Sequence, residues 1–231
     1  MSSEDPVVVG LPLRGEWVAV NTPAFRVPSH GTDQLGQRYA YDFLRLGGTR
    51  GQYYMGSPFQ LWMVGVRLTD CFGYGQPVVA PFDGQVAEAR DGVRERGHLW
   101  PVGDLLAVLR NSLAYGGRLE TLTAGEVQSL VGNHVILEKD GIFALCAHLA
   151  NGSVKVKKGD TVKEGEPIGK VGHSGNSTAP HLHFQLMDRV DGLNAKGVPC
   201  AFKEYEEWAG QGWKAVKGSM PGRMVRIRLG P

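Results

Sequence analysis

The stretch from residue 133 to residue 187, NHVILEKDGIFALCAHLANGSVKVKKGDTVKEGEPIGKVGHSGNSTAPHLHFQLM, decides the expected fold. It contains three apolar runs of strand length, HVILEK, FALCAHL and HLHFQLM. Between them, glycines recur every three to six residues, as tight turns require. Short strands joined by frequent turns are typical of a barrel or a sandwich, so we expect a mainly β protein.

The β pattern continues on both sides of this stretch. PVVAPFDGQVAEARDG, at residues 77–92, predicts two strands around a turn, because Asp-Gly readily adopts positive φ. The alternation of Tyr39, Tyr41 and Phe43 predicts a strand, and MVRIRL at residues 224–229 predicts a closing one. Short apolar segments broken by proline and glycine over residues 7–27 suit edge strands.

A few short helices are expected at the periphery. The pattern from Val102 to Leu113 predicts an amphipathic helix, and a capping box of Thr123 and Glu126 predicts another over EVQSLV. Residues 202–208 read as a short helix. Residues 44–77 show no sustained helical period and are interpreted as an extended loop with one strand near residues 61–66.

Composition excludes several classes of protein. The formal charge of +2 gives no basic field for nucleic acid, and no apolar stretch approaches the length that spans a membrane. The three cysteines are far apart and are predicted to be buried thiols. No linker divides residues 1–231, which indicates one domain. The segment MSSEDPVVVG lacks the pattern of a signal peptide, so a cytoplasmic location is expected for the chain as written, or the cell envelope if the protein is exported.

The most specific chemical feature is His181-Leu182-His183. In a strand, alternation sends both imidazoles to the same face of the sheet. Catalytic zinc usually takes three protein ligands and leaves a fourth position open, so further ligands are needed. His30 and Asp42 are candidates, because Asp42 is an acidic residue between two aromatics in a strand pattern, where an unpaired carboxylate would be costly.

Several separate motifs resemble those of the lysostaphin-type, or LytM-type, zinc endopeptidases of peptidase family M23. The family's His followed by an Asp in a strand resembles His30 with QRYAYDF at residues 37–43, and its Pro-Val-x-Ala-Pro-x-Asp-Gly segment resembles residues 77–84. Residues 132–135, 146–149 and 156–172 resemble its Gly-Asn turn, its Tyr-x-His-Leu motif and its glycine-rich run. Residues 174–184 resemble its signature almost letter for letter.

The resemblance implies a fold, a cofactor and an activity. It implies an antiparallel sandwich or barrel-like fold with a duplicated hybrid motif, a core over about residues 28–187, insertions near 44–77 and 90–131, and a C-terminal extension. It implies Zn²⁺ held by His30, Asp42 and His183, with His148 and His181 as catalytic residues. The implied activity is that of a metalloendopeptidase, a zinc hydrolase acting on peptide substrates in the peptidoglycan of the bacterial cell wall.

The sequence leaves alternatives open. Asp33 competes with Asp42 as a ligand; we prefer Asp42 because it lies in the strand pattern and Asp33 in a loop. His98, His134 and His173 are expected to be non-catalytic. The chain could instead be a catalytically silent LytM-type binding module, although all five site residues are present. The run KVKKGDTVKEGEPIG also resembles lipoyl-type carrier domains, but no lysine stands in a carrier context. The oligomeric state cannot be read from the sequence.

Overall fold

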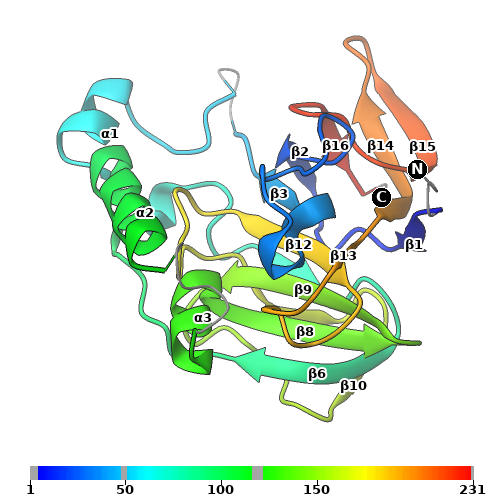
Figure 1. Cartoon of the computed structure of the whole chain (residues 1–231). Coiled ribbons are helices and arrows are strands. Elements are labelled where there is room, and N and C mark those ends of the chain that lie inside the picture. Colours follow the sequence, from blue (N-terminus) through cyan, green and yellow to red (C-terminus); the bar gives the residue numbers. More distant parts are fainter. Residues whose placement is uncertain (1–4, 48–50, 116–121, 230–231) are drawn as a thin grey trace.

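The computed structural model describes residues 5–47, 51–115 and 122–229, and it confirms a mainly β fold with peripheral helices (Figure 1). The first half contains β1 (Val7–Val9), β2 (Glu16–Asn21), the 3-10 helix η1 (Gln34–Tyr39), β3 (Tyr41–Leu44), α1 (Pro58–Met63), β4 (Val66–Arg67), the 3-10 helix η2 (Leu68–Asp70), β5 (Pro77–Val79), β6 (Gly84–Arg90), β7 (His98–Leu99) and α2 (Pro101–Tyr115). The second half contains α3 (Ala124–Val131), β8 (Asn133–Lys139), β9 (Ile142–Leu149), β10 (Thr161–Val162), β11 (Pro167–Lys170), β12 (Leu182–Met187), β13 (Gly197–Val198), β14 (Cys200–Trp208), β15 (Trp213–Ser219) and β16 (Arg226–Arg228).

One large sheet organises the molecule. Among the described residues its strand order is β1-β14-β16-β2-β3-β12-β9-β8-β6-β10, with β13 beside β12 and β15 beside β14. Its neighbouring strands are antiparallel, apart from β1 and β14. Two small sheets, β5 with β11 and β4 with β7, accompany it. The sheet therefore joins strands from both ends of the chain around β3, β12 and β9.

The two faces of the sheet differ in what they contact. In β12, Phe184 and Leu186 belong to the main core cluster, together with side chains of the β5–β11 pair such as Val78 and Ile168. The alternate residues of β12, His183 and Gln185, line a cleft on the opposite face. One face is thus the hydrophobic core and the other carries polar side chains.

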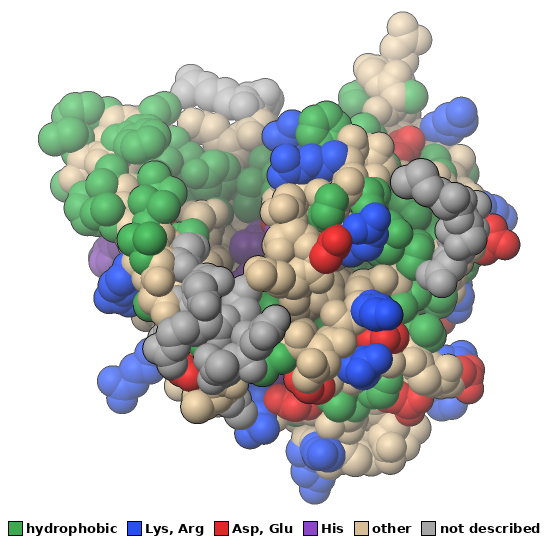
Figure 2. Space-filling view, in the orientation of Figure 1, with side chains coloured by type: hydrophobic (Ala, Val, Ile, Leu, Met, Phe, Trp, Pro, Cys, Tyr) green, Lys and Arg blue, Asp and Glu red, His purple; other side chains and the backbone are tan. Residues whose placement is uncertain are grey.

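The helices lie beyond one end of the sheet (Figure 1). The predicted helices at 102–113 and 126–131 are confirmed as α2 and α3, and the Thr123–Glu126 capping box precedes α3. Helices α1 and α2 expose many large apolar side chains, which Figure 2 shows gathered over these two helices. They are Phe59, Trp62, Met63, Val102, Leu105, Leu106, Leu109 and Leu113.

Two predicted elements are wrong. Residues 61–66, predicted as a strand, form the end of helix α1 and the start of β4; Ser57 accepts from Gln60 N as N-cap and Pro58 occupies the first turn. Residues 202–208, predicted as a helix, lie in strand β14, which pairs with β15 along Phe202–Trp208. In addition, Tyr39 ends η1 and does not extend the predicted strand.

The expectations about the cysteines and about three further strands agree with the structure. Cys71, Cys146 and Cys200 are buried free thiols, as predicted. The predicted strands at 77–79, 84–90 and 226–228 are present. None of the helices in the described ranges is long and apolar enough to cross a membrane.

Candidate metal centre and neighbouring histidines

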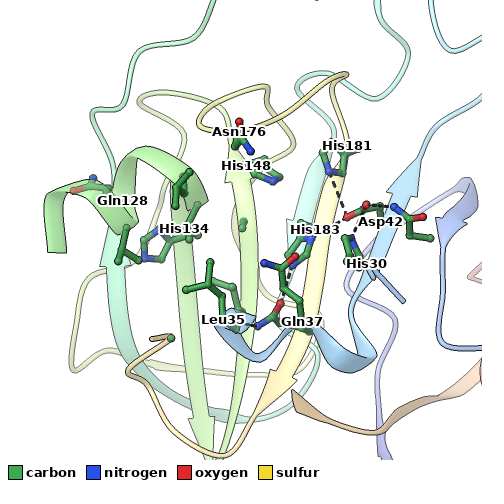
Figure 3. Close-up of a pocket in the computed structure, with 18 of the residues that line it drawn as sticks. His30, Leu35, Gln37, Asp42, Gln128, His134, His148, Asn176, His181 and His183 are labelled. Atoms are coloured by element: carbon green, nitrogen blue, oxygen red, sulfur yellow. Dashed lines mark hydrogen bonds and ion pairs between the residues drawn. The ribbon is translucent and has the colours of Figure 1, made fainter. Parts of the chain in front are cut away.

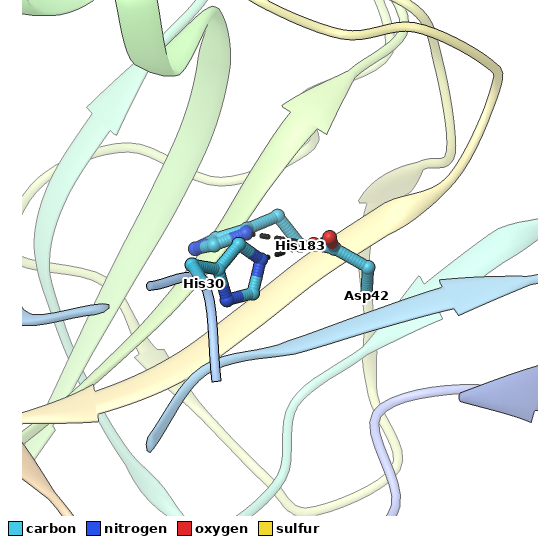
Figure 4. Close-up of side chains that lie close together, drawn as sticks. All are labelled: His30, Asp42 and His183. Atoms are coloured by element: carbon cyan, nitrogen blue, oxygen red, sulfur yellow. Dashed lines mark hydrogen bonds and ion pairs between the residues drawn. The ribbon is translucent and has the colours of Figure 1, made fainter. Parts of the chain in front are cut away.

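Asp42, His30 and His183 come together at the centre of the sheet (Figure 4). Asp42 in β3 lies directly opposite His183 in β12, and His30 reaches them from the loop before η1. Asp42 Oδ1 is 2.9 Å from His183 Nδ1, and Asp42 Oδ2 is 2.8 Å from His30 Nε2. The three ligand atoms lie within 4.8 Å of one another, which is the arrangement of a metal site.

The hydrogen bonds around His183 determine which of its ring nitrogens carries the proton. Gln185 Nε2 donates to the carbonyl oxygen of Leu35 at 2.7 Å, so the amide oxygen of Gln185 faces His183. That oxygen can only accept, and it lies 2.8 Å from His183 Nε2. The contact with Gln185 therefore requires a proton on His183 Nε2, and Nδ1 is the ring nitrogen that faces the Asp42 carboxylate.

His30 is oriented by the same logic. Ser29 Oγ donates to the carbonyl oxygen of Gln37 at 3.2 Å, so it accepts a hydrogen bond from His30 Nδ1, 3.0 Å away. Nε2 is then the nitrogen of His30 that faces Asp42. One nitrogen of each imidazole ring thus faces the same carboxylate.

This donor set fits a divalent cation. When His30 is protonated on Nδ1 and His183 on Nε2, the two nitrogens that face Asp42 are free to bind a cation. Two imidazole nitrogens and one carboxylate oxygen are also a ligand set found in catalytic zinc sites. Asn21 Nδ2 donates to Asp42 Oδ2 at 2.6 Å and helps to hold the carboxylate in place.

The charge state of Asp42 agrees with this role. Burial on its own raises the pKa of the Asp42 carboxyl. The charge of His181 and the surrounding histidines outweigh burial and hold this pKa well below its usual range. Asp42 is therefore an anion in the sheet, as a metal ligand must be.

His181 lies beside this cluster, and its Nε2 is 3.4 Å from Asp42 Oδ1. Its Nδ1 is 2.7 Å from the carbonyl oxygen of Ala179, which can only accept, so Nδ1 is protonated and Nε2 faces the cluster. Burial lowers the pKa of His181, but the Asp42 carboxylate outweighs burial and raises it above the ordinary value. The structure therefore places His181 and His183 on one face, as their alternation predicts.

His148 reaches the cleft through an irregularity of strand β9. Its φ is +60°, in the left-handed region that non-glycine residues rarely adopt, and the β8–β9 register shifts here from Val135↔Cys146 to Asn133↔Leu149. This bulge lets Ala147 and His148 both line the cleft while Leu149 turns into the core. Strained backbone of this kind is often found at functional sites.

The surroundings of His148 keep its ring neutral. Its Nδ1 lies 2.9 Å from the carbonyl oxygen of Ser174, so Nε2 is left unprotonated. Burial, followed by the charges of His181 and His183, holds the pKa of His148 well below its ordinary value. The His148 and His181 rings are adjacent, with centroids 4.9 Å apart.

These residues line a cleft of about 1120 Å³ (Figure 3). One wall is apolar and comes from α2, α3 and the sheet; it includes Leu105, Val108, Val127, Val131, Ile136 and Leu145. The other side includes Gln34 and Gln37 of η1. A hollow of this size, with polar groups converging at one place, is typical of an active site.

The remaining predicted residues fall outside the cluster. Asp33 is exposed and pairs with Arg38 Nη1 at 2.8 Å, away from the other ligands. His98 is exposed. His134 lines the cleft, with its Nε2 3.4 Å from Glu88 Oε1.

The sequence interpretation missed a buried network around His173. His173 Nε2 is 3.2 Å from Asp104 Oδ1, and Arg96 Nε donates to the same oxygen at 2.6 Å. Burial raises the pKa of Asp104, but the hydrogen bond with His173 and the Arg96 charge lower it overall. The available signal was Asp104 itself, the acidic residue in the first turn of helix α2, where apolar residues surround it in the sequence.

Comparison with known proteins identifies a family for part of the chain. Residues 114–196 match the model described as "Peptidase family M23". The glycyl-glycine endopeptidase ALE-1 of Staphylococcus capitis is 44% identical over 73 residues, which are 31% of this chain and 20% of that protein. The peptidoglycan DD-endopeptidase ShyA of Vibrio cholerae is 36% identical over 72 residues, 30% of this chain and 16% of that protein.

A solved structure also matches over most of the chain. The catalytic domain of the antimicrobial peptidase lysostaphin from Staphylococcus simulans is 20% identical, with a TM-score of 0.39, over 80% of this chain and 88% of that one. The chain spans a fifth or less of the length of the two curated relatives.

Family M23 is a family of metallopeptidases. The resemblance predicted from the motifs is confirmed for part of the chain: residues 114–196, which include His148, His181 and His183, match this family, and the two relatives from Staphylococcus capitis and Vibrio cholerae are endopeptidases by name.

Proposed function

We propose that this chain is a zinc-dependent endopeptidase that hydrolyses peptide bonds in the cross-links or stem peptides of bacterial peptidoglycan. The observation that carries the proposal is the convergence of His30 Nε2 and His183 Nδ1 on the Asp42 carboxylate. The names of the two relatives, one a glycyl-glycine endopeptidase and one a peptidoglycan DD-endopeptidase, support the substrate class.

His30, Asp42 and His183 would hold the metal. A bound zinc ion supplies a Lewis acid, which polarises a carbonyl group and lowers the pKa of water. The supporting hydrogen bonds from Asn21, Ser29 and Gln185 keep the three ligand side chains in one orientation, so little rearrangement accompanies metal binding.

His148 and His181 would handle the protons of the reaction. Each ring has its Nδ1–H on a backbone carbonyl, so each presents Nε2 to the cleft. In this tautomer Nε2 can accept a proton from the attacking water, and the protonated ring can pass a proton to the leaving amine or hydrogen-bond the developing oxyanion.

The cleft is suited to an extended peptide. It runs past the histidines between the apolar wall and η1, and its volume of about 1120 Å³ exceeds what a single amino acid requires. The side-chain amides of Gln34 and Gln37 offer hydrogen bonds, while the apolar wall accepts side chains of the substrate.

The first test measures metal and cleavage in the same set of variants. We expect about one zinc per chain by elemental analysis of the wild type, and its loss in His183→Ala. His148→Ala and His181→Ala should keep zinc but release no fragments from dye-labelled peptidoglycan sacculi. His98→Ala, an exposed histidine outside the cleft, is the matched control and should behave as wild type.

Quenched peptides containing either a Gly-Gly bond or a bond between D-amino acids then identify the bond that is cut. Absence of zinc in the wild type, even after incubation with the metal, would refute the proposal and favour a silent binding module. Zinc without cleavage of either peptide or of sacculi would refute the substrate class.

A further inference from the structure

The insertion at residues 90–131 reaches the active-site loop through a buried polar network. Asp104 in α2 is 2% exposed, His173 is 1% exposed and Ser177 is fully buried. Asp104 is far from the other two in the sequence, and it belongs to a helix at the periphery of the fold (Figure 1). Buried polar groups are retained only where they have partners, so the contacts of these three residues indicate what they do.

The contacts form a continuous chain that ends at His181. Asp104 Oδ1 lies 3.2 Å from His173 Nε2, and His173 Nδ1 lies 3.1 Å from Ser177 Oγ. Ser177 Oγ donates to the carbonyl oxygen of Ala179 at 2.7 Å and is 3.2 Å from His181 Nδ1. That same carbonyl accepts from His181 Nδ1 at 2.7 Å.

Arg96 closes the network from the other side. Its Nε donates to Asp104 Oδ1 at 2.6 Å and its Nη2 donates to the carbonyl oxygen of Ser177 at 2.7 Å. Asp104 therefore fixes two groups, the His173 ring and the Arg96 guanidinium, and both of them hold Ser177. Asp104 Oδ2 also accepts from Trp100 N at 2.8 Å, which ties the carboxylate to the start of α2.

The network determines the position of the His181 ring. Ser177 holds the Ala179 carbonyl, and this carbonyl accepts from His181 Nδ1, so that Nε2 faces Asp42. A ring that rotated away from this carbonyl would no longer present Nε2 to the cleft. Small displacements of a catalytic group, on the order of 1 Å, cost about a hundredfold in rate.

We propose that Asp104, on the inserted helix α2, is a positioning residue for His181 and acts through His173 and Ser177. The inserted helix α2 then helps to hold His181 in its position in the active site. This inference rests on the proposed function only where activity is the readout, because the orientation of His181 can also be observed directly.

The kinetic test uses Asp104→Asn, Ser177→Ala and the double variant. Asparagine keeps the size of Asp104 but cannot accept from Trp100 N and from His173 and Arg96 at once. On the quenched peptide that the wild type cleaves, each single variant should lower kcat by about tenfold to a hundredfold, with KM changed less than about twofold and zinc retained. Because both act along one path, the double variant should be no slower than the slower single variant.

Arg110→Ala is the matched control, since Arg110 is an exposed polar residue on the same helix. It should leave kcat unchanged. Wild-type kcat in Asp104→Asn, multiplicative losses in the double variant, or an equal loss in Arg110→Ala would each overturn the proposal.

The spectroscopic test does not depend on cleavage. Long-range ¹H–¹⁵N spectra of the labelled chain report the environment of the His181 ring; we expect one set of ring signals with a hydrogen-bonded Nδ1–H in the wild type, and displaced or doubled ring signals in Asp104→Asn and Ser177→Ala. A wild-type His181 with an unprotonated Nδ1, or unchanged ring signals in both variants, would refute the proposal. If Asp104→Asn does not fold, the proposal is tested by comparing the spectrum of the wild type with that of Ser177→Ala. If no peptide is cut, the proposed function fails while this comparison still stands.

Discussion

Gln185 and Ser29 matter at the scale of single residues because each of them orients one histidine of the candidate metal centre. Each of these neighbours donates its own hydrogen bond to a backbone carbonyl, of Leu35 and of Gln37, and so can only accept from the histidine. Side chains that never touch the metal commonly prepare a metal site in this way. The sequence interpretation named the candidate ligands but not these supports.

Gln185→Met tests this preparation. Methionine preserves the volume of the buried side chain but removes the acceptor for His183 Nε2, so the ring is free to place its proton on Nδ1. We expect zinc affinity to fall about tenfold to a hundredfold, measured by competition with a chelator. Gln34→Met, in the exposed part of the cleft, should leave the affinity unchanged. Equal affinities of Gln185→Met and wild type would show that Gln185 does not orient His183.

A second prediction at the scale of single residues follows from the left-handed backbone conformation of His148. A non-glycine residue in this conformation costs roughly 1–2 kcal/mol, and glycine avoids most of that cost. With zinc removed, His148→Gly should therefore be more stable to urea than His148→Ala by about 1 kcal/mol, although both lose activity. Ala144→Gly, in the regular part of β9, should destabilise the fold instead. Equal stabilities of the two His148 variants would show that the backbone at this position is not strained.

At the scale of elements, Glu88 in β6 and His134 in β8 form a pair whose interaction makes the stability of the fold depend on pH. A hydrogen bond with His134 lowers the pKa of Glu88 to about 2 from an ordinary value of 4.5, against the effect of burial and with help from Arg90. Because the folded pKa is the lower one, the stabilisation is complete above about 4.5 and is lost as the pH falls toward 2.

The measurement compares wild type with Glu88→Gln by urea unfolding at several pH values, without metal. Since the Glu88 side chain is partly exposed, we expect a difference of about 1 kcal/mol at pH 6 that disappears as the pH approaches 2. Glu204→Gln, an exposed carboxylate in β14, should show no such trend. A Glu88→Gln difference that stays constant with pH would contradict the assignment.

The two wrong elements show where local sequence is insufficient. In CAFKEYEEW the spacing of Phe202 and Tyr205 and the many charged residues suit a helix, yet pairing with β15 and β16 makes it a strand. In PFQLWM the apolar run suits a strand, while Ser57 and Pro58 begin a helix. By contrast, β8, β9 and β12 follow their apolar patterns because burial of one face determines them.

At the scale of the whole molecule, the site is assembled from distant parts of the chain. Motif order along the sequence was enough to predict His30, Asp42, His148, His181 and His183 as one group, and the structure brings them together. The network of Asp104, His173 and Ser177 could not be predicted, because it depends on how an insertion packs against a loop 69 residues later. The spacing of residues along the sequence gives no information about a contact between such distant segments.

The pairing of β16 with β2 has a consequence for the order in which the protein is made. β2 holds Asn21 beside Asp42, and its other edge is covered by β16, which leaves the ribosome after His183. The residues of the candidate metal centre are therefore all synthesised before β16 is available to cover the outer edge of β2. We expect the sheet around this centre to gain its last partner strand late, when β16 pairs with β2.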